Sequence, residues 1–353
     1  MFLPLFFLFY VGEVSAATVQ TLHLQENENN LFSSVVDSAN GYIYFGTNSS
    51  PCKIIRIRMS DFVEIDSLSP STEPQCGNIN TAVIDQTGGY GYFTNNTGNP
   101  GHVVKVRLSD FTIDNILTLP PGQAWSSAID GQKGFLYIGA TPPSGTIDTG
   151  QIFKVDLATF SVVDVFNFPS EYGYPDVLTI DKQGNFLYAG VNTGPGEVTR
   201  GAILKINLQT FSQETILELP YPNDTPESGF IDFNEEFIYF SVGAPRIYKL
   251  NISDLSIVDT LELDEETFPS GFSLSTLLNN DRIALFVTPG CSGAKLAIVD
   301  LRLFSLNHYR QITSNKVGIG TMSLDNSTKS LYLGNLYCRV TSTPGVVIKR
   351  SAL

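Results

Sequence analysis

The stretch GYIYFGTNSSPCKIIRIRMSDF, residues 41–62, decides the fold, because it returns as YGYFTNNTGNPGHVVKVRLSDF at residues 90–111. Each copy has the pattern of a strand rich in aromatic residues, a segment of turn-forming residues and a second strand rich in β-branched residues, and it ends in a polar-polar-Phe motif. Related units occupy residues 135–160, 186–211, 237–255, 283–304 and 331–350, and the last of them is incomplete. The chain therefore carries seven copies of one β unit.

Two further strands complete each unit. A short apolar strand that ends in Asp, or in Asn279 in one copy, precedes each aromatic strand, and these end residues recur every 45–51 residues. A fourth strand follows the closing Phe, as in residues 112–119 and 161–168. Four strands in such a period are typical of a β-propeller blade. We therefore predict an all-β fold, a seven-bladed β-propeller of four-stranded blades.

The two ends of the repeat predict how the ring closes. The seventh unit stops after its third strand, at residues 346–350, whereas residues 18–24 match the pattern of a fourth strand. We predict that this N-terminal strand completes the last blade. Closure of this kind removes the free sheet edges that would otherwise pair with other chains.

The first 16 residues have the features of a signal peptide. An apolar run extends from Met1 to Val11, and small residues precede a predicted cleavage site after Ala16. The run is shorter than the roughly 20 residues that span a bilayer. We expect residues 17–353 to form a single propeller domain that is secreted, with no transmembrane segment. The N-x-S/T sequons that glycosylation would then use are at Asn48, Asn95, Asn223, Asn251 and Asn326.

The charge balance excludes one class of partner. The chain has 21 Lys and Arg against 35 Asp and Glu, for a formal net charge of −14. Nucleic-acid binding needs a basic face that neutralises phosphates. We therefore expect no nucleic-acid partner. Separately, we expect the protein to be a monomer that uses no cofactor.

The repeated YxYFGT…KVxLSDF unit resembles the extracellular NHL/YVTN-type propeller repeats of bacterial and protist surface proteins. The resemblance covers essentially the whole mature chain. Such propellers serve mostly as binding platforms and less often as enzymes, so the resemblance implies the fold more than a function.

The four cysteines predict disulfides that fit the propeller topology. Cys52 and Cys76 fall in loops on the same face of the first blade, and Cys291 and Cys338 fall in turns of neighbouring blades. Secretion favours oxidation, so we predict the pairs Cys52–Cys76 and Cys291–Cys338. Four free buried thiols are the alternative.

The recurring Asp is interpreted as structural. A catalytic carboxylate is needed once, whereas a residue that caps a turn is needed in every blade. The same interpretation covers Asp61, Asp110 and Asp254 in the closing motif. The chain has three histidines, His23, His102 and His308, and no two of them have metal-ligand spacing, so we predict neither a catalytic residue nor a metal site.

Aromatic residues at the entrances of the inner strands are the candidate ligand-binding residues: Trp125, Tyr172, Tyr174, Phe230 and Phe272. Exposed aromatics there suit stacking on sugar rings or anchoring of a protein. The other interpretation is that they only pack between the inner strands.

We accordingly expect a secreted binding module that recognises a protein or a glycan through its loop face. One alternative is a metal-dependent lactonase or lyase, with Ca²⁺ ligands drawn from Glu73, Asn78, Asp176, Glu227 and Asn315. The other is a structural component of a wall or an extracellular matrix.

Overall fold

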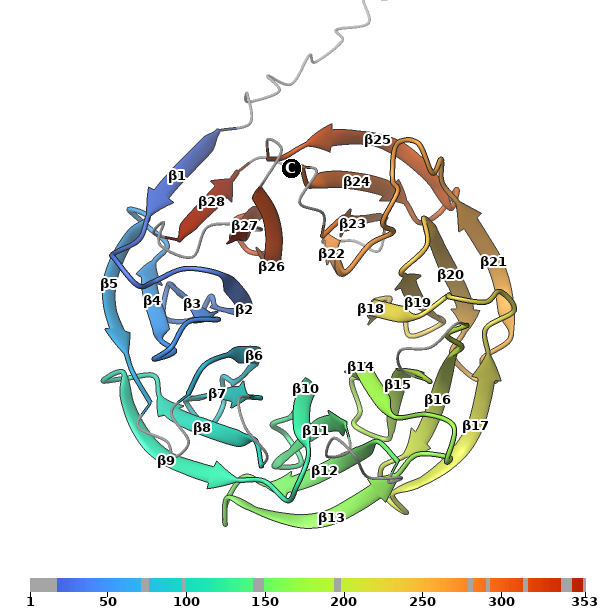
Figure 1. Ribbon diagram of the computed structural model, residues 1–353, viewed down its shortest axis with the longest axis horizontal. Helices are drawn as coiled ribbons and strands as arrows, with labels where there is room; N and C mark the ends of the chain where they lie inside the picture. Colours follow the sequence, from blue (N-terminus) through green and yellow to red (C-terminus); the bar gives the residue numbers. More distant parts are fainter. Residues whose placement is uncertain are drawn as a thin grey trace, which may run out of the picture.

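The computed structural model describes residues 18–70, 76–96, 100–141, 149–193, 198–278, 282–289, 293–313, 317–337 and 345–351. Within these residues, 28 strands form seven four-stranded antiparallel sheets, and no segment is helical. The sheets stand around a common axis as the blades of a β-propeller (Figure 1). The predicted fold is therefore confirmed. None of the described residues belongs to a helix that could cross a membrane.

In each blade the first strand lies nearest the ring axis and the fourth lies at the rim (Figure 1). The strands of blades 1 to 3 are β2 (Leu31–Asp37), β3 (Tyr42–Thr47), β4 (Ile54–Arg58) and β5 (Val63–Leu68); β6 (Ile79–Asp85), β7 (Tyr90–Asn95), β8 (His102–Arg107) and β9 (Thr112–Thr118); β10 (Gln123–Asp130), β11 (Phe135–Thr141), β12 (Gln151–Asp156) and β13 (Ser161–Asn167). The strands of blades 4 and 5 are β14 (Tyr174–Ile180), β15 (Phe186–Asn192), β16 (Gly201–Asn207) and β17 (Ser212–Glu218); β18 (Pro226–Ile231), β19 (Phe237–Val242), β20 (Arg246–Asn251) and β21 (Ile257–Glu262). Those of blades 6 and 7 are β22 (Leu274–Leu278), β23 (Ile283–Val287), β24 (Lys295–Asp300) and β25 (Ser305–Gln311); β26 (Val317–Asp325), β27 (Ser330–Tyr337), β28 (Val346–Arg350) and β1 (Val19–His23).

Blade 7 confirms the predicted closure of the ring. Its strand order is β26, β27, β28 and β1, so the N-terminal strand forms its outer edge (Figure 1). Val19 pairs with Arg350 and His23 with Val346 in antiparallel register. The two ends of the chain thus hold the ring together through one sheet.

The closing Phe of the repeat forms the packing between blades. The Phe111 ring centroid lies 5.7 Å from that of Tyr44 in the preceding blade, and Phe160 lies 6.0 Å from Tyr92 in the same way. These two phenylalanines adopt positive φ values of 54° and 49°. Left-handed backbone costs a residue with a side chain about 1–2 kcal/mol. Burial of an aromatic side chain, worth roughly 1.5–3 kcal/mol, offsets that cost.

A cation from the third strand lies over these rings. The Lys105 Nζ lies 4.2 Å from the ring centroid of Tyr90 and 5.4 Å from that of Phe160 in the next blade. The cations at this position are Arg56, Lys105, Lys154, Lys205, Lys249 and Lys349. In blade 6 the third-strand residue in the same register is Ile298, so this blade places no cation at that position of the junction with blade 7.

The antiparallel blades give the ring two distinct faces. The connections between blades and the loops between second and third strands lie on one face, which we call the connection face. The turns between first and second strands and between third and fourth strands lie on the opposite face, which we call the turn face.

The recurring Asp caps turns on the turn face, as predicted. Asp85 accepts a hydrogen bond from the Gly88 N–H at 2.8 Å, and Asp181 accepts one from the Asn185 N–H at 2.7 Å. The corresponding residues of other blades, which also accept backbone N–H groups of their own turns, are Asp37, Asp130, Asp232 and Asp325. The position in blade 6, Asn279, lies outside the described residues.

Candidate functional site at the ring axis

The inner strands share an irregularity at their connection-face ends. Six of the described inner strands carry a β-bulge directly after a buried residue, seen as register shifts between the following pairs: Leu31/Ser33, Ile79/Thr81, Ala124/Ser126, Pro175/Val177, Pro226/Ser228 and Ile319/Thr321. A bulge leaves one residue outside the ladder and redirects its side chain. The residue before each bulge is buried, whereas the bulged residue itself is at least partly accessible to solvent.

The bulged residues differ from blade to blade, unlike the turn aspartates. They are Phe32, Asn80, Trp125, Asp176, Glu227 and Gly320. In blade 7 a Cβ on Gly320 would lie 2.3 Å from the Leu31 carbonyl oxygen, so that position admits no side chain without a shift of the backbone. Blades 3, 4 and 5 place an indole and two carboxyl groups at consecutive positions around the axis.

Trp125 is the exposed aromatic residue of this set. Its side chain is 38% exposed, and its Nε1 donates a hydrogen bond to Thr141 Oγ1 at 3.2 Å. Ser126, the next residue, donates to the Pro175 carbonyl oxygen at 2.6 Å, which holds blade 3 against blade 4 beside Asp176. The hydrogen bond fixes the indole edge, and the exposed part of the ring stays available for contact with a ligand.

Asp176 and Glu227 form a carboxyl pair next to Trp125. Burial and, to a smaller degree, the charge of Glu227 raise the pKa of Asp176 to about 7. Burial also raises the pKa of Glu227. Asn192 Nδ2 donates to Asp176, and Thr225 Oγ1 donates to Glu227 at 3.0 Å. Near neutral pH the carboxyl group of Asp176 is therefore partly protonated.

Asn80 precedes Trp125 in the ring of bulged residues. Its Nδ2 lies 3.5 Å from the Ala124 carbonyl oxygen, while its Oδ1 is buried without a hydrogen-bond partner. The Oδ1 of Asn78, at the entrance of the same strand, is also buried and unpartnered. Unpartnered buried acceptors are rare because they are costly, so these two favour a donor supplied by a ligand or by water.

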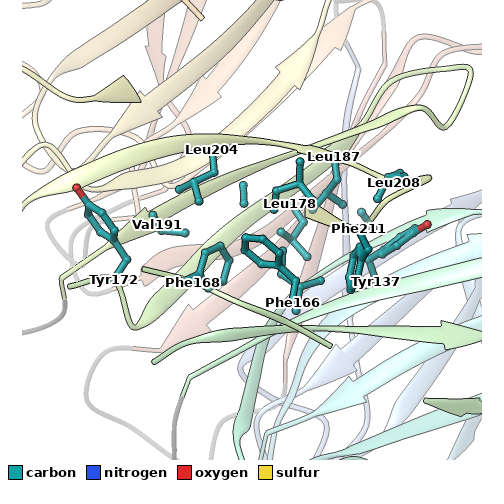
Figure 2. Close-up of a cluster of buried hydrophobic side chains, with 14 of the residues drawn as sticks. Tyr137, Phe166, Phe168, Tyr172, Leu178, Leu187, Val191, Leu204, Leu208 and Phe211 are labelled. Atoms are coloured by element: carbon teal, nitrogen blue, oxygen red, sulfur yellow. The ribbon is translucent and has the colours of Figure 1, made fainter. Parts of the chain in front are cut away.

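Three of the other four predicted aromatic residues pack against neighbouring side chains. Tyr172 and Phe272 are buried, and Tyr172 packs in the core between blades 3 and 4 with Phe166, Phe168 and Val191 (Figure 2). Phe230 stacks on Tyr239 at 5.2 Å between ring centroids. These three therefore follow the alternative interpretation, in which the aromatics pack between inner strands.

Tyr174 is half-buried at the start of β14, where it pairs with Asn192 of the second strand. Of the five predicted aromatic residues, Trp125 and Tyr174 are thus the two that blades 3 and 4 leave accessible near the carboxyl pair. The hydrophobic pattern of the sequence does not predict the bulge that exposes Trp125, because the bulge depends on the register of pairing with the second strand.

The described histidines form no site with these groups. His23 and His308 are exposed, whereas His102 is buried, and burial lowers the pKa of His102. Among the described residues, no group of three or more His, Cys, Asp and Glu is arranged to hold a metal ion. Of the Ca²⁺ candidates, Glu73 and Asn315 lie outside those residues.

The predicted disulfide between Cys52 and Cys76 is confirmed. The two Cα atoms lie 5.2 Å apart, and the bond joins the second-to-third-strand loop of blade 1 to the connection that enters blade 2. Closure of a loop of 24 residues stabilises a fold by about 3 kcal/mol in the chain-entropy account. Cys291 and Cys338 lie outside the described residues, as does the predicted signal peptide, residues 1–16.

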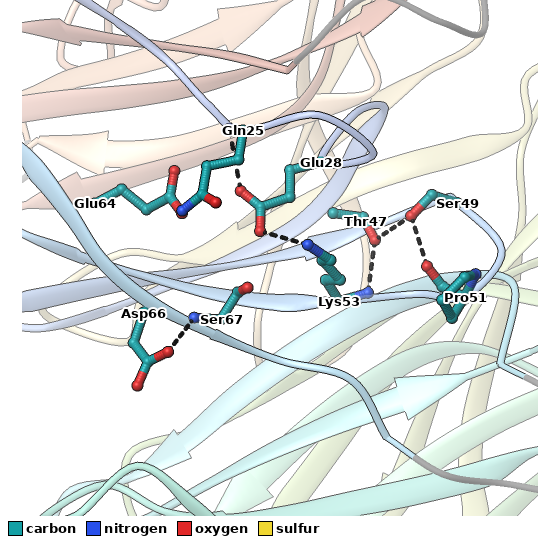
Figure 3. A network of polar contacts seen from close by, with 9 residues as sticks. All are labelled: Gln25, Glu28, Thr47, Ser49, Pro51, Lys53, Glu64, Asp66 and Ser67. Carbon is teal, nitrogen blue, oxygen red and sulfur yellow. Dashed lines mark hydrogen bonds and ion pairs between the residues drawn. The ribbon is translucent and has the colours of Figure 1, made fainter.

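Two buried ion pairs anchor other loops of the connection face. Glu28 is fully buried in the connection to blade 1, where Lys53 Nζ lies 2.9 Å from its Oε1 (Figure 3). Gln25 Nε2 donates to Glu64 at 2.6 Å in the same cluster, and burial together with the charge of Glu28 raises the pKa of Glu64 to about 7. In the connection to blade 5, Arg246 Nη1 lies 2.6 Å from the buried Asp224 Oδ1.

The predicted glycosylation sites differ in their burial. Asn95 is fully buried at the end of β7, so the folded chain offers no room for a glycan on its side chain. Asn223 and Asn326 are exposed, and Asn48 and Asn251 are half-buried. The sequence pattern does not separate these cases, because a sequon contains no information on burial.

No known family model matches the chain, and no curated protein matches it. The propeller fold implied by the resemblance is confirmed by the structure, whereas the NHL/YVTN type of the repeat stays a prediction.

Proposed function

We propose that this chain is a secreted binding module that recognises a glycan at the ring axis on the connection face. The observation that carries the proposal is the exposed Trp125 indole on the blade next to the Asp176–Glu227 carboxyl pair, at the equivalent bulged position. The bulges place these groups on three consecutive blades, so a ligand at the axis can contact all of them.

The chemistry of the three groups matches that of a sugar. An indole face packs against the apolar C–H face of a pyranose ring. Carboxylate and amide oxygens accept hydrogen bonds from hydroxyl groups, and charged acceptors form the stronger ones. A protonated Asp176 also donates to a hydroxyl or ring oxygen. The unpartnered Asn80 Oδ1 adds a further acceptor next to Trp125.

Secretion is supported by two features. The predicted signal peptide precedes the propeller, and the Cys52–Cys76 disulfide is typical of proteins that fold in an oxidising compartment.

The proposal is tested with a glycan array, followed by calorimetric titration of the strongest hit, using the full chain secreted from a host cell. Trp125→Ala should weaken binding more than tenfold, because it removes the exposed indole. The variant also loses the hydrogen bond to Thr141, so its melting temperature should fall only slightly. Asp176→Asn and Glu227→Gln should weaken binding to a smaller degree.

The matched control is Phe233→Ala, which removes an exposed aromatic ring from the turn face. This variant should bind like the wild type. A folded wild-type chain that binds no glycan, or a Trp125→Ala variant with an unchanged glycan profile, would refute the proposal.

A further inference from the structure

A cavity of about 220 Å³ lies between blades 6 and 7, far from the site proposed for the glycan. Its apolar lining comes from Leu278, Ile283, Leu285 and Ile298 of blade 6. Leu278 and Ile283 flank the turn between the first and second strands, so the cavity belongs to the turn face.

The cavity exists because this junction lacks the side chains that fill the others. Between blades 2 and 3 the corresponding space holds Tyr92, the Lys105 side chain and the Phe160 ring. The strand register places Leu285 at the position of Tyr92 and Ile298 at that of Lys105. The residue that precedes β1, the fourth strand of blade 7, is Thr18, where Phe62 and Phe111 precede the fourth strands of blades 1 and 2.

The rim of the cavity is cationic. Arg310 of β25 and Arg350 of β28 both line it, together with His308. Burial lowers the pKa of Arg350, and the nearby charge of Arg310 lowers it further. At the position of Arg350, blades 1 and 2 carry the buried apolar residues Ile57 and Val106.

Neither arginine is neutralised by the described part of the chain. No described carboxylate lies within 4.0 Å of the Arg310 or Arg350 guanidinium. Two adjacent guanidinium groups repel each other and favour an anion between them. Their accumulation is unexpected in a chain with 35 acidic and 21 basic side chains.

We propose that this cavity binds a small amphipathic anion, namely a carboxylate on an aromatic or short aliphatic body. The body occupies the apolar part formed by Leu285 and Ile298, and the carboxylate contacts Arg310 and Arg350. An engineered apolar cavity of about 150 Å³ holds benzene in another protein. The present volume therefore accommodates a phenyl ring with a short chain.

The test is a calorimetric titration of the full chain with 3-phenylpropionate and, separately, with 3-phenylpropylamine, which has a body of the same size and the opposite charge. The acid should bind and the amine should not. Arg310→Gln and Arg350→Gln should each weaken binding of the acid at least tenfold. Arg310 is exposed, so its replacement leaves the core intact.

Two matched variants separate the cavity from general effects. Arg302→Gln removes an exposed arginine of the same blade that does not line the cavity, and it should leave binding unchanged. Leu285→Tyr restores the tyrosine of the other blades, so it should fill the cavity and abolish binding while the chain stays folded.

Three results would overturn the inference. The first is equal binding of the acid and the amine, and the second is an affinity that the Arg310 and Arg350 variants do not change. The third is a wild-type chain that binds no acid.

Discussion

The two ends of the inner strands carry residues of different kinds. On the turn face the strands end in the same residue, as in Asp85 and Asp181, and each of these carboxylates caps its own turn. On the connection face the same strands begin with bulged residues that differ, from Asn80 to Trp125. A role that every blade needs recurs in every blade, whereas a role that the molecule needs once does not. Variation among blades therefore points to the connection face as the functional one.

Blade 4 contains both kinds of carboxylate on one strand. Asp181, just beyond β14, accepts hydrogen bonds from the N–H groups of Asn185 and Phe186 at 2.7 and 3.2 Å. Asp176, five positions earlier, accepts one from the side chain of Asn192. Burial raises the pKa of both carboxyl groups, but the backbone donors oppose the rise only at Asp181. Of these two carboxylates, Asp176 is therefore the one that we expect to interact with a ligand.

On the connection face, single buried side chains hold the loops in place. We therefore expect Asp224→Ala to cause the largest loss of stability. Removal of this carboxylate leaves Arg246 and the Tyr248 hydroxyl without their buried acceptor. Breaking a buried ion pair costs about 3–5 kcal/mol. Urea unfolding measures the loss. The control is Asp61→Ala, which breaks the exposed pair with Arg58 on the turn face and should leave the unfolding midpoint unchanged. Equal losses in both variants would contradict the distinction.

Asp176→Asn should change how stability depends on pH. The pKa of Asp176 is about 7 in the folded chain and near 3.9 when unfolded, so the folded state binds the proton more tightly. Ionisation of Asp176 therefore destabilises the wild type as pH rises from about 4 to about 7, and the loss is complete above that window. The variant lacks this loss. Melting temperatures from about pH 5 to about pH 8 should show the wild type falling relative to Asp176→Asn, and a constant difference would contradict the assignment.

The smallest expected effect concerns the two carboxylates of blade 5. Asp232→Ala removes the acceptor for the N–H groups of Glu236 and Phe237, at 2.9 and 3.2 Å, and should cost about 1 kcal/mol. Glu227→Gln, at the other end of the same strand, keeps its Thr225 contact and should not lower stability, because burial disfavours the ionised form of Glu227. Thermal unfolding compares the two variants directly. If Glu227→Gln were the more destabilising change, the division of roles between the two faces would be wrong.

Much of the fold could be predicted because each strand of the repeat is visible in the sequence. The seven units, the turn aspartates and the closing strand follow from patterns of adjacent residues. The candidate site was predicted less well. Trp125 was identified, but Tyr172 and Phe272 are buried, and Asp176 and Glu227 could be named only among several acids and amides. Whether an aromatic residue is exposed depends on side chains from the neighbouring blade, and the local pattern does not contain them.

The sequence by itself determined the number of blades, the order of their strands and the closure of the ring by β1. These features depend on hydrogen bonding and hydrophobic periodicity within one unit, which repeats along the chain. Only the tertiary structure decided which residues bulge toward the axis, which sequon is buried, and that the junction between blades 6 and 7 is hollow. Those features depend on contacts between blades, and the sequence pattern of a single unit does not specify these contacts.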